Sequence, residues 1–471
     1  MKLIKDTIHG YIKIPRIYCQ EFIDTDVFQR LRRIEQTSIR SVFPCAHHDR
    51  FVHSLGTFHL GSIAIDFLFK NSENILNELN INSDSRNTLR QTFEIACLLH
   101  DCGQAPFSHT FEHYFETAND LKGLLENNIN DLDFSDDLNS SDSKPHEKVS
   151  AYLVLIYFKN NIAKINSKID ISLIVRMIIG CRYRKSNDPF HQFLNCLIKL
   201  LNSDVIDVDK LDYAARDRWA SGYNASTVDM ERLISSIEIS KKNDNYIFCI
   251  KKSAMSEVES LIDSRNFLYM WIINHHKVIY EQNLLSKSVN AMLKIMCPSD
   301  PDSVTNEIFS INSIINKKEV LGNTIFQLTD DDIIYLLKKY CHGESSFKEW
   351  ISRKHLLKPL WKSYAEYNEI ILSQIRAKDN GPEQIKRCGI KAVERVVNKS
   401  PFYVEIVKQK MFRIIENDLF INTENGLIDY YKVAINKRDN MKISPYLYVY
   451  VHEDSLNLKE KIIKELKHEL S

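Results

Sequence analysis

Glycine and proline are scarce in this chain, with 12 Gly and 11 Pro among 471 residues. Because these residues punctuate tight turns, their scarcity favours long helices over folds made of many short strands. The 10 cysteines include no Cys-x-x-Cys pair. This excludes the usual zinc-ribbon spacing and indicates reduced cytosolic thiols instead of a disulfide framework.

An excess of charge is also missing, because Lys+Arg and Asp+Glu are equal at 62 each and the formal net charge is zero. A neutral chain is poorly suited to coating nucleic acid, although it can still hold a local basic pocket. We therefore expect nucleic acid not to be the main partner.

Long hydrophobic runs are absent as well. Apolar runs such as residues 153–158 are far too short to cross a bilayer, and residues 1–6 lack the pattern of a signal peptide. We expect no membrane partner and a cytoplasmic location. With 44% hydrophobic residues, the chain can bury a large core, and its length fits one catalytic core plus a smaller lobe.

Apolar residues recur three and four positions apart over residues 20–112, as at Phe28, Leu31 and Ile34, which predicts helices. Helical patterning resumes over residues 147–199 and 256–296. Residues 245–250 alternate and predict a strand in a hairpin with residues 235–239, and residues 445–451 also resemble a strand. The expected fold is mainly α, with a helical core and a smaller α+β C-terminal lobe.

Composition also suggests a division of the chain. Residues 117–145 are polar and acidic, which predicts a mobile surface insertion. We assign residues 1–290 to the catalytic core. Residues 291–471 would form an α+β region that serves oligomerisation or regulation.

The most informative motif is the pair His100-Asp101, which ends the apolar run of residues 93–99. It offers a neutral nitrogen and an anionic oxygen, a good combination for a divalent metal. Gly103 follows and is expected to end the helix in a left-handed conformation. A lone His-Asp dipeptide is weak, because it often occurs by chance.

Two further residues, His53 and Asp209, complete an ordered series of His, His-Asp and Asp, each within apolar helical sequence. Two imidazoles and two carboxylates suit Mn, Fe or Zn better than Ca, and they leave coordination positions for water and a phosphate oxygen. Each histidine taken alone is more often a hydrogen-bonded core residue. The order of all four favours a metal site.

In this order the motifs resemble the HD-domain metal phosphohydrolases, and more narrowly the deoxynucleoside triphosphate triphosphohydrolases. The resemblance implies an HD-domain helical core and an enzyme that attacks the α-phosphorus with water, releasing the deoxynucleoside and intact triphosphate. It covers roughly residues 1–280. The matching stretches are residues 8–12, 24–25, 28–32, 43–44, 50–56, 99–111, 146–147, 207–217 and 265–266.

The resemblance also implies roles for residues around the metal. A triphosphate carries about four negative charges, for which Arg and Lys are the usual partners. Histidine can protonate a departing 5′-oxygen near neutral pH. An additional Mg could accompany the triphosphate. The implied phosphate-binding residues are Arg50, Lys210 and Arg265, and Arg265 is expected to open a helix. Tyr213 and Asp217 would hold the sugar, and Gln36 matches a substrate-binding glutamine. The acid–base candidates are His109 and His146.

Three positions depart from the family pattern. Gln104 stands where relatives often have a histidine; it can bond a phosphate oxygen but cannot transfer a proton, so we expect His109 to be the main donor. Residues 37–41 are bulkier than the usual Gly-rich segment, and Ile273 with Asn274 replaces a tyrosine beside the sugar. These changes concern substrate identity and basal rate.

The N-terminal segment matches a second nucleotide site of the family. The resemblance implies that an activating guanine nucleotide or deoxynucleotide binds between subunits of a dimer or tetramer. The other interpretation is an ordinary amphipathic helix with a solvated basic face. The matching residues are Lys2, Asp24, Gln29 and Arg32.

Three functions stay open. The leading hypothesis is a deoxynucleoside triphosphate triphosphohydrolase, for which the resemblance suggests a role in antiphage defence. The second is an HD-group phosphohydrolase acting on a cyclic, oligomeric or modified nucleotide. The third is a non-catalytic nucleotide sensor.

Overall fold

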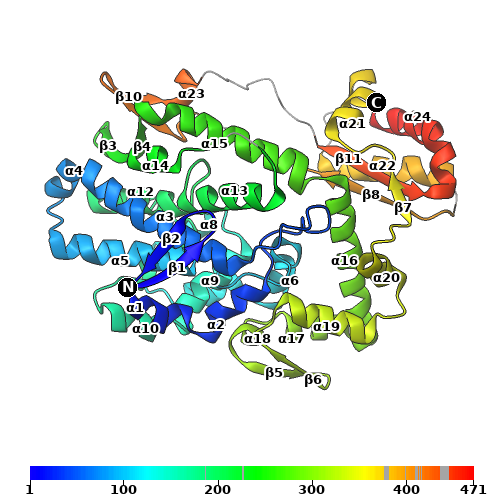
Figure 1. Ribbon diagram of the computed structural model, residues 1–471, viewed down its shortest axis with the longest axis horizontal. Helices are drawn as coiled ribbons and strands as arrows, with labels where there is room; N and C mark the ends of the chain where they lie inside the picture. The colour runs from blue at the N-terminus through cyan, green and yellow to red at the C-terminus, as the bar shows by residue number, and fades with distance from the viewer. Residues whose placement is uncertain are drawn as a thin grey trace.

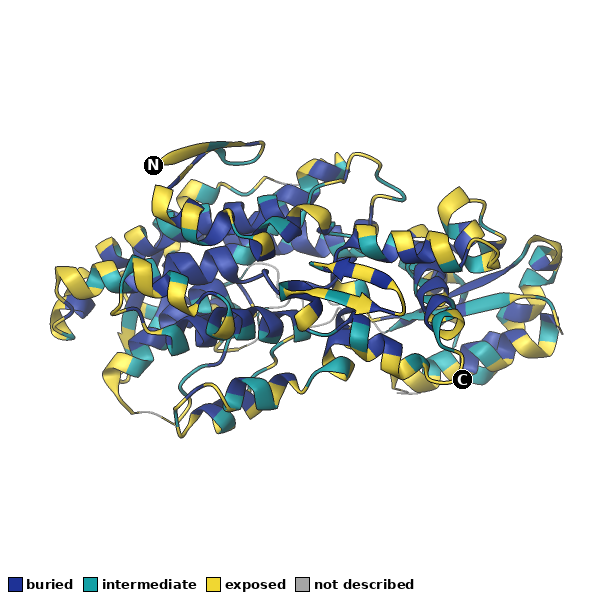
Figure 2. Cartoon of the chain, turned by 90° about the horizontal axis from the view of Figure 1, so that it is seen from below, coloured by how far each residue is buried: buried dark blue, intermediate teal, exposed yellow. Residues whose placement is uncertain are grey.

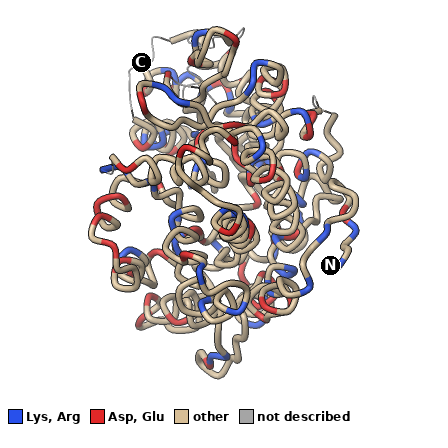
Figure 3. Tube along the Cα trace, turned by 90° about the vertical axis from the view of Figure 1, so that its left-hand side faces the viewer, with Lys and Arg blue, Asp and Glu red and all other residues tan. Residues whose placement is uncertain are grey.

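The computed structural model describes the chain except for residues 186, 225–226, 376–380, 398, 409–411, 413, 415 and 435–444. Helices dominate the described part and the sheets are small, which confirms a mainly α fold with some β. Figure 1 shows a large helical body, mostly coloured blue to green, and a smaller lobe coloured yellow to red; the orange β10 and α23 lie on the body beside β3 and β4. Basic and acidic side chains are interspersed along the trace, in keeping with the zero net charge (Figure 3).

The centre of the body is built on a long helix, α3, which packs against α5 and α13. By length and composition α3 could cross a membrane, but 67% of its most apolar window is buried inside the protein, as expected of a core helix. Asp49 caps α3 and Asp207 caps α13, each accepting a backbone N–H of the first turn. The helices of the body up to residue 221 are α1 (Arg16–Tyr18), α2 (Asp26–Gln29), α3 (Arg50–Asn71), α4 (Glu73–Glu78), α5 (Ser83–Leu99), α6 (Glu112–Ala118), α7 (Leu121–Glu126), α8 (Phe134–Asn139), α9 (Pro145–Ile156), α10 (Lys159–Ile165), α11 (Ile171–Ile178), α12 (Pro189–Leu201) and α13 (Val208–Ser221).

Three small sheets of the described residues belong to the body. The strand predicted at residues 245–250 is confirmed: it lies in β4 and pairs antiparallel with β3. The sequence did not predict that β4 also pairs in parallel with β9, far along the chain. One two-stranded sheet pairs β1 (Lys2–Asp6) with β2 (Gly10–Ile14), and another pairs β5 (Lys317–Val320) with β6 (Asn323–Phe326). The four-stranded sheet runs β10 (Gly426–Asp429), β9 (Phe420–Thr423), β4 (Asn245–Lys251) and β3 (Ile237–Lys242).

The segment expected to be a mobile loop, residues 117–145, contains the short helices α7 and α8. Their side chains Leu125, Phe134 and Leu138 are buried. Asp137 of α8 also accepts a hydrogen bond from the buried Arg176 of α11 at 3.0 Å. A few apolar residues, correctly spaced, are therefore enough to pack this polar segment against the core.

The C-terminal lobe has its own hydrophobic cluster around Trp361 and strand β11, which contains the strand predicted at residues 445–451. The boundary expected after residue 290 falls inside α16, and the body's cluster includes buried residues as late as Ile421 and Tyr430. Figure 2 shows buried residues in both parts. The remaining elements are α14 (Met230–Ser235), α15 (Met255–Phe267), α16 (His276–Met296), α17 (Pro301–Ile308), α18 (Asn312–Ile315), α19 (Asp330–Tyr340), α20 (Ser345–Ser352), β7 (Leu357–Pro359), α21 (Tyr364–Ile370), α22 (Pro382–Val397), β8 (Phe402–Val407), α23 (Tyr430–Val433), β11 (Tyr446–His452) and α24 (Lys459–Leu470).

Gly103 does not adopt the expected left-handed conformation, which occurs instead at Phe107 and Ser108. Its role is close packing. A Cβ at Gly103 would lie 2.4 Å from the backbone nitrogen of Ser150 and 2.7 Å from the backbone carbon of Val149. The loop after the His-Asp pair therefore presses directly on α9, which only glycine permits.

Candidate metal centre

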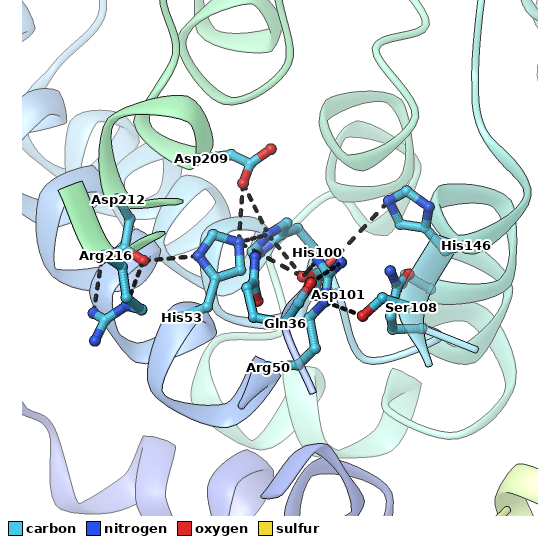
Figure 4. A network of polar contacts seen from close by, with 12 residues as sticks. Gln36, Arg50, His53, His100, Asp101, Ser108, His146, Asp209, Asp212 and Arg216 are labelled. Carbon is cyan, nitrogen blue, oxygen red and sulfur yellow. Dashed lines mark hydrogen bonds and ion pairs between the residues drawn. The ribbon is translucent and has the colours of Figure 1, made fainter. Parts of the chain in front are cut away.

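Three helices bring the four predicted metal ligands together (Figure 4). His53 lies in the first turn of α3, His100 and Asp101 follow α5, and Asp209 lies in the first turn of α13. His53 Nε2 is 3.0 Å from Asp209 Oδ1, 3.3 Å from His100 Nε2 and 3.6 Å from Asp101 Oδ2. His53, His100 and Asp101 are buried and form a group that could hold a metal ion.

The orientation of both imidazoles fits a metal. His53 Nδ1 lies 2.7 Å from Asp212 Oδ2, and His100 Nδ1 lies 2.9 Å from the carbonyl oxygen of Cys97. Each ring therefore turns Nε2 toward Asp101 and Asp209. Metal-binding histidines use this arrangement, in which a second partner fixes the tautomer through the other ring nitrogen.

The electrostatics of the cluster favour a cation. Burial alone lowers the pKa of His53, but hydrogen bonds to Asp209 and Asp212 raise it to about 10. Burial acts to raise the pKa of Asp209, yet the two histidines hold it well below its ordinary value. The cluster thus keeps its carboxylates ionised and stabilises positive charge between the rings, the environment a dication needs.

Arg50 is buried beside this cluster (Figure 4). Its Nη1 donates to Asp101 Oδ2 at 2.7 Å, its Nη2 to the carbonyl of Gln36 at 3.2 Å, and its Nε to Ser108 Oγ at 3.0 Å. Gln36 is buried too, and its Oε1 accepts no hydrogen bond from any residue that the structure describes. Two predicted substrate residues therefore adjoin the metal ligands.

A second cluster joins the two acid–base candidates through one carboxylate, Glu112. Its Oε1 is 2.5 Å from His109 Nδ1 and 2.8 Å from His146 Nδ1. His146 is buried, with Nε2 3.8 Å from Asp101 Oδ1, whereas His109 is exposed. Burial lowers the pKa of His146, but Glu112 more than offsets this and raises it. Gln104 is fully buried below, with Nε2 3.5 Å from Glu112.

Two other predicted substrate residues, Lys210 and Asp217, are paired with neighbouring charged side chains. Lys210 Nζ is 2.5 Å from Asp207 Oδ2, and Asp217 Oδ1 is 2.6 Å from His48 Nε2. These contacts hold both side chains against neighbouring residues.

Arg265 lies over the ring of Tyr213, with 5.6 Å between Cζ and the ring centroid. It does not open a helix as expected but lies in the last turn of α15. Its Nε and Nη1 are buried and bond to no residue within the described part of the chain.

Some residues at the site escaped the sequence analysis. Asp212 accepts from His53 and from Arg216, four residues later on the same helix, and His9 approaches it from the N-terminal hairpin. The spacing of Asp212 and Arg216 on one face of α13 was a usable signal. So was the position of Glu112, three residues after His109.

A distant segment holds the loop that leads from the His-Asp pair to His109. Buried Arg30 donates to the carbonyls of Cys102 at 3.2 Å, Gln104 at 2.7 Å and Leu328 at 2.8 Å. Asp330, at the start of α19, accepts the N–H of Phe107 at 2.6 Å and that of Glu35 at 2.9 Å. This segment, residues 328–330, therefore fixes the loop beneath the candidate active site.

The four residues predicted for a second nucleotide form a chain of contacts on the surface. Lys2 Nζ is 3.8 Å from Asp24 Oδ1, and both side chains are about half exposed. Gln29 donates to the carbonyl of Ile23 at 2.7 Å, and Arg32 donates to Gln29 Oε1 at 2.9 Å. The structure therefore links the four through contacts at the surface, and Arg32 also lies over the ring of Phe51, with 3.5 Å between Cζ and the ring centroid.

A separate cavity of about 210 Å³ lies where α16 meets the C-terminal lobe. Two carboxylates contact its lining: Glu281 Oε1 lies 2.5 Å from His355 Nε2 and 3.6 Å from Arg353 Nε, and Glu349 accepts from the hydroxyl of Tyr280 at 2.8 Å. The cavity's lining is mainly basic and aromatic: His276, Lys277, Tyr280, Arg353, His355, Leu357, Lys358, Pro359 and Tyr450.

Comparison with known proteins identifies relatives, although no family model matches the chain. It is 31% identical over 293 residues to a deoxynucleoside triphosphate triphosphohydrolase SAMHD1 homolog of Dictyostelium discoideum, covering 62% of this chain and 48% of that protein. It is 30% identical over 330 residues to uncharacterized protein MG461 of Mycoplasma genitalium, covering 69% and 67%. A putative HD domain-containing protein, L394 of Acanthamoeba polyphaga mimivirus, is 27% identical over 85% of this chain and 78% of its own length.

The chain thus spans about half the length of the Dictyostelium relative. Among solved structures, a hypothetical protein from Aquifex aeolicus aligns over 99% of this chain and 100% of its own, with a TM-score of 0.62 and 22% identity. This likeness establishes a shared fold.

Proposed function

Because the chain belongs to the HD-domain family of deoxynucleoside triphosphate triphosphohydrolase-like proteins, we propose that it hydrolyses deoxynucleoside triphosphates to deoxynucleoside and triphosphate. One observation carries the proposal. His53 and His100 are each anchored through Nδ1, so their Nε2 atoms meet the carboxylates of Asp101 and Asp209 at a single point. The four would hold Mn, Fe or Zn, which when bound supplies Lewis acidity to water and phosphate.

Proton transfer falls to the second cluster. Hydrolysis breaks the bond between the α-phosphorus and the 5′-oxygen; water adds hydroxide to phosphorus, and the departing oxygen takes a proton. His109 is exposed at the edge of the cluster and can give that proton. Loss of solvation keeps the pKa of His109 below its ordinary value although Glu112 acts to raise it, so its imidazolium releases a proton readily. His146, nearer to Asp101, orients the same carboxylate and is the reserve donor.

Binding of the triphosphate falls to cationic side chains. Arg265 has two buried N–H donors without partners in the described chain, and such donors favour an anionic ligand over an apolar one. Lys210 would exchange its contact with Asp207 for a phosphate oxygen, and a Mg ion would accompany the phosphates. Tyr213, beside Arg265, and Asp217 would hold the sugar.

The test is incubation with each deoxynucleoside triphosphate, singly and mixed, followed by detection of free triphosphate. Arg265→Ala and Lys210→Ala should weaken substrate use by about tenfold or more without removing metal, because each loses a charge-assisted contact. Arg86→Ala is a matched control, since Arg86 pairs with Glu73 on the surface. A nucleoside monophosphate with pyrophosphate as products would contradict the proposal.

A second candidate is hydrolysis of another nucleotide by the same centre. Gln104 is buried where relatives often have a catalytic histidine, and its Oε1 is without a hydrogen bond among the described residues. Cyclic and oligomeric nucleotides therefore belong in the same assay, with product chromatography. Nucleotide binding with no turnover of any substrate would favour the sensor hypothesis.

We also propose activation by a second nucleotide, coupled to assembly into an oligomer. The contact chain of Lys2, Asp24, Gln29 and Arg32 offers donors and acceptors for a base and a phosphate. A ligand that binds only the assembled form shifts both equilibria together. Mixtures of nucleotides should therefore raise both rate and mass by light scattering, and Asp24→Ala should weaken both. If Asp24→Ala matches wild type in all mixtures, this site does not exist.

A further inference from the structure

The turn of the N-terminal hairpin reaches the metal centre, although most of the hairpin is at the surface. Strands β1 and β2 expose Leu3 and Tyr11. Between them, the ring of His9 is buried and its Nε2 lies 2.6 Å from Asp212 Oδ1. Asp212 in turn anchors His53, so a surface hairpin is only one residue removed from a candidate metal ligand.

The turn itself is fixed by Asp6. One carboxylate oxygen accepts the backbone N–H groups of Ile8 and His9, both at 2.8 Å, and the other accepts from Arg216 Nη1 at 2.9 Å. Burial acts to raise the pKa of Asp6, but Arg216 and these hydrogen bonds lower it, so the carboxylate is ionised. His9 is therefore presented to Asp212 from a rigid turn.

Asp212 is held on several sides. Arg216 Nε donates to Oδ2 and Nη2 to Oδ1, both at 2.9 Å, while His53 Nδ1 lies 2.7 Å from Oδ2. A Cβ at Gly56 would lie 1.9 Å from Oδ1, so the carboxylate presses on the bare backbone of α3. Among the described partners of Asp212, His9 is the one that comes from outside α3 and α13.

We propose that His9 is a positioning residue of the metal centre. By donating to Oδ1, it holds the Asp212 carboxylate in the plane that keeps Oδ2 on His53 Nδ1, and thereby keeps His53 Nε2 directed at the metal. Without His9, Oδ1 of Asp212 keeps only the N–H of Arg216 among its described partners, so the carboxylate is held from the α13 side alone and its contact with His53 Nδ1 loosens. The inference rests on the proposed metal site but not on the identity of the substrate.

The experiment measures metal retention by the full-length protein loaded with Co²⁺. Loss to an excess of chelator is followed by the Co²⁺ absorption band, which also reports ligand geometry. His9→Ala should lose metal about 10–100 times faster than wild type, the usual effect of removing an outer partner of a ligand. His9→Gln should restore retention, because its amide can donate to the same carboxylate.

His59→Ala is the matched control. The ring centroid of His59 lies 5.3 Å from that of His9, but among the described hydrogen bonds of Asp212 none comes from His59. It should retain metal like wild type. The inference is overturned if His9→Ala retains metal and spectrum unchanged, or if His9→Gln loses metal as fast as His9→Ala. If the Co²⁺ results hold but no deoxynucleotide is hydrolysed, His9 keeps its role and the proposed reaction fails.

Discussion

Two clusters of histidine and carboxylate adjoin in this protein, and their internal geometry differs. In the first, His53 and His100 each have a separate anchor for Nδ1, and their Nε2 atoms meet near Asp101 and Asp209. In the second, His109 and His146 both turn Nδ1 toward the same oxygen of Glu112.

The difference shows how similar side chains can be given different tasks. Separately anchored rings leave lone pairs converging with carboxylates, which is a site for a cation. The second cluster, His109, Glu112 and His146, is also close enough to hold an ion, but both of its rings face a single carboxylate, which suits proton transfer. We therefore expect changes in the first cluster to act on metal content and changes in the second to act on turnover.

The largest effect is expected from His100→Ala combined with Asp101→Asn. Removing a nitrogen ligand and an anionic ligand should reduce metal from about one ion per chain to below about a tenth of that, and abolish activity. Elemental analysis and triphosphate release are the measurements. Unchanged metal in the double variant would place the ion elsewhere.

The next largest effect is expected from His109→Ala. Turnover should fall by about two to four orders of magnitude, the usual contribution of a general acid, with metal content unchanged. Steady-state rates test the fall in turnover, and elemental analysis of the same sample tests whether the metal content is unchanged. A rate within a few-fold of wild type would assign the proton to His146 or to water.

Glu112→Gln should change the pH profile more than the maximal rate. Glu112 raises the pKa of His146, so its loss lowers the pH at which the imidazole pair gives up its proton. The alkaline limb of the rate profile should move to lower pH by about one unit or more. Glu116→Gln on the same helix is the control, because Glu116 is an exposed partner of Lys148. If the alkaline limb does not move, Glu112 does not control the pKa of the group that donates the proton.

The smallest effect concerns Asp330, which supports the loop of the second cluster. Burial raises its pKa to about 7, so between about pH 4 and pH 7 the folded protein keeps a proton that the unfolded chain releases. This contribution to stability is present at low pH and declines as pH rises through that window. In the wild type this titration should lower the free energy of unfolding by roughly 1–4 kcal/mol between pH 4.5 and 7.5, and Asp330→Asn should lack this decline.

Urea unfolding at both pH values measures this difference, with the exposed neighbour Asp331 changed to Asn as control. Parallel pH dependence in wild type and Asp330→Asn would show that Asp330 does not titrate in this range.

The sequence predicted what depends on local order. Apolar spacing located the helix that carries His53 and the helix that ends just before His100, and alternation located the β3–β4 hairpin. The helix of Asp209, α13, lies between the predicted helical ranges 147–199 and 256–296. The chemistry of the four ligands could be inferred because their residue types and order are restrictive.

Contacts between distant segments could not be predicted in this way. Nothing local links His9 to Asp212, or Asp330 to Phe107, because each pair forms only when the whole body packs. The left-handed conformation predicted for Gly103 was wrong for a related reason. Glycine is required there because Ser150 on α9 lies too close for a side chain, a contact that the local sequence does not reveal.

The segment of residues 328–330 limits how the protein can be shortened for expression or engineering. A fragment ending at residue 290 would delete the carbonyl that Arg30 Nη1 binds and the carboxylate that receives the N–H groups of Glu35 and Phe107. Each buried donor left without an acceptor costs about 1–3 kcal/mol, and a charged one costs more. A minimal catalytic fragment therefore has to extend through α19, well beyond the last motif that carries chemistry.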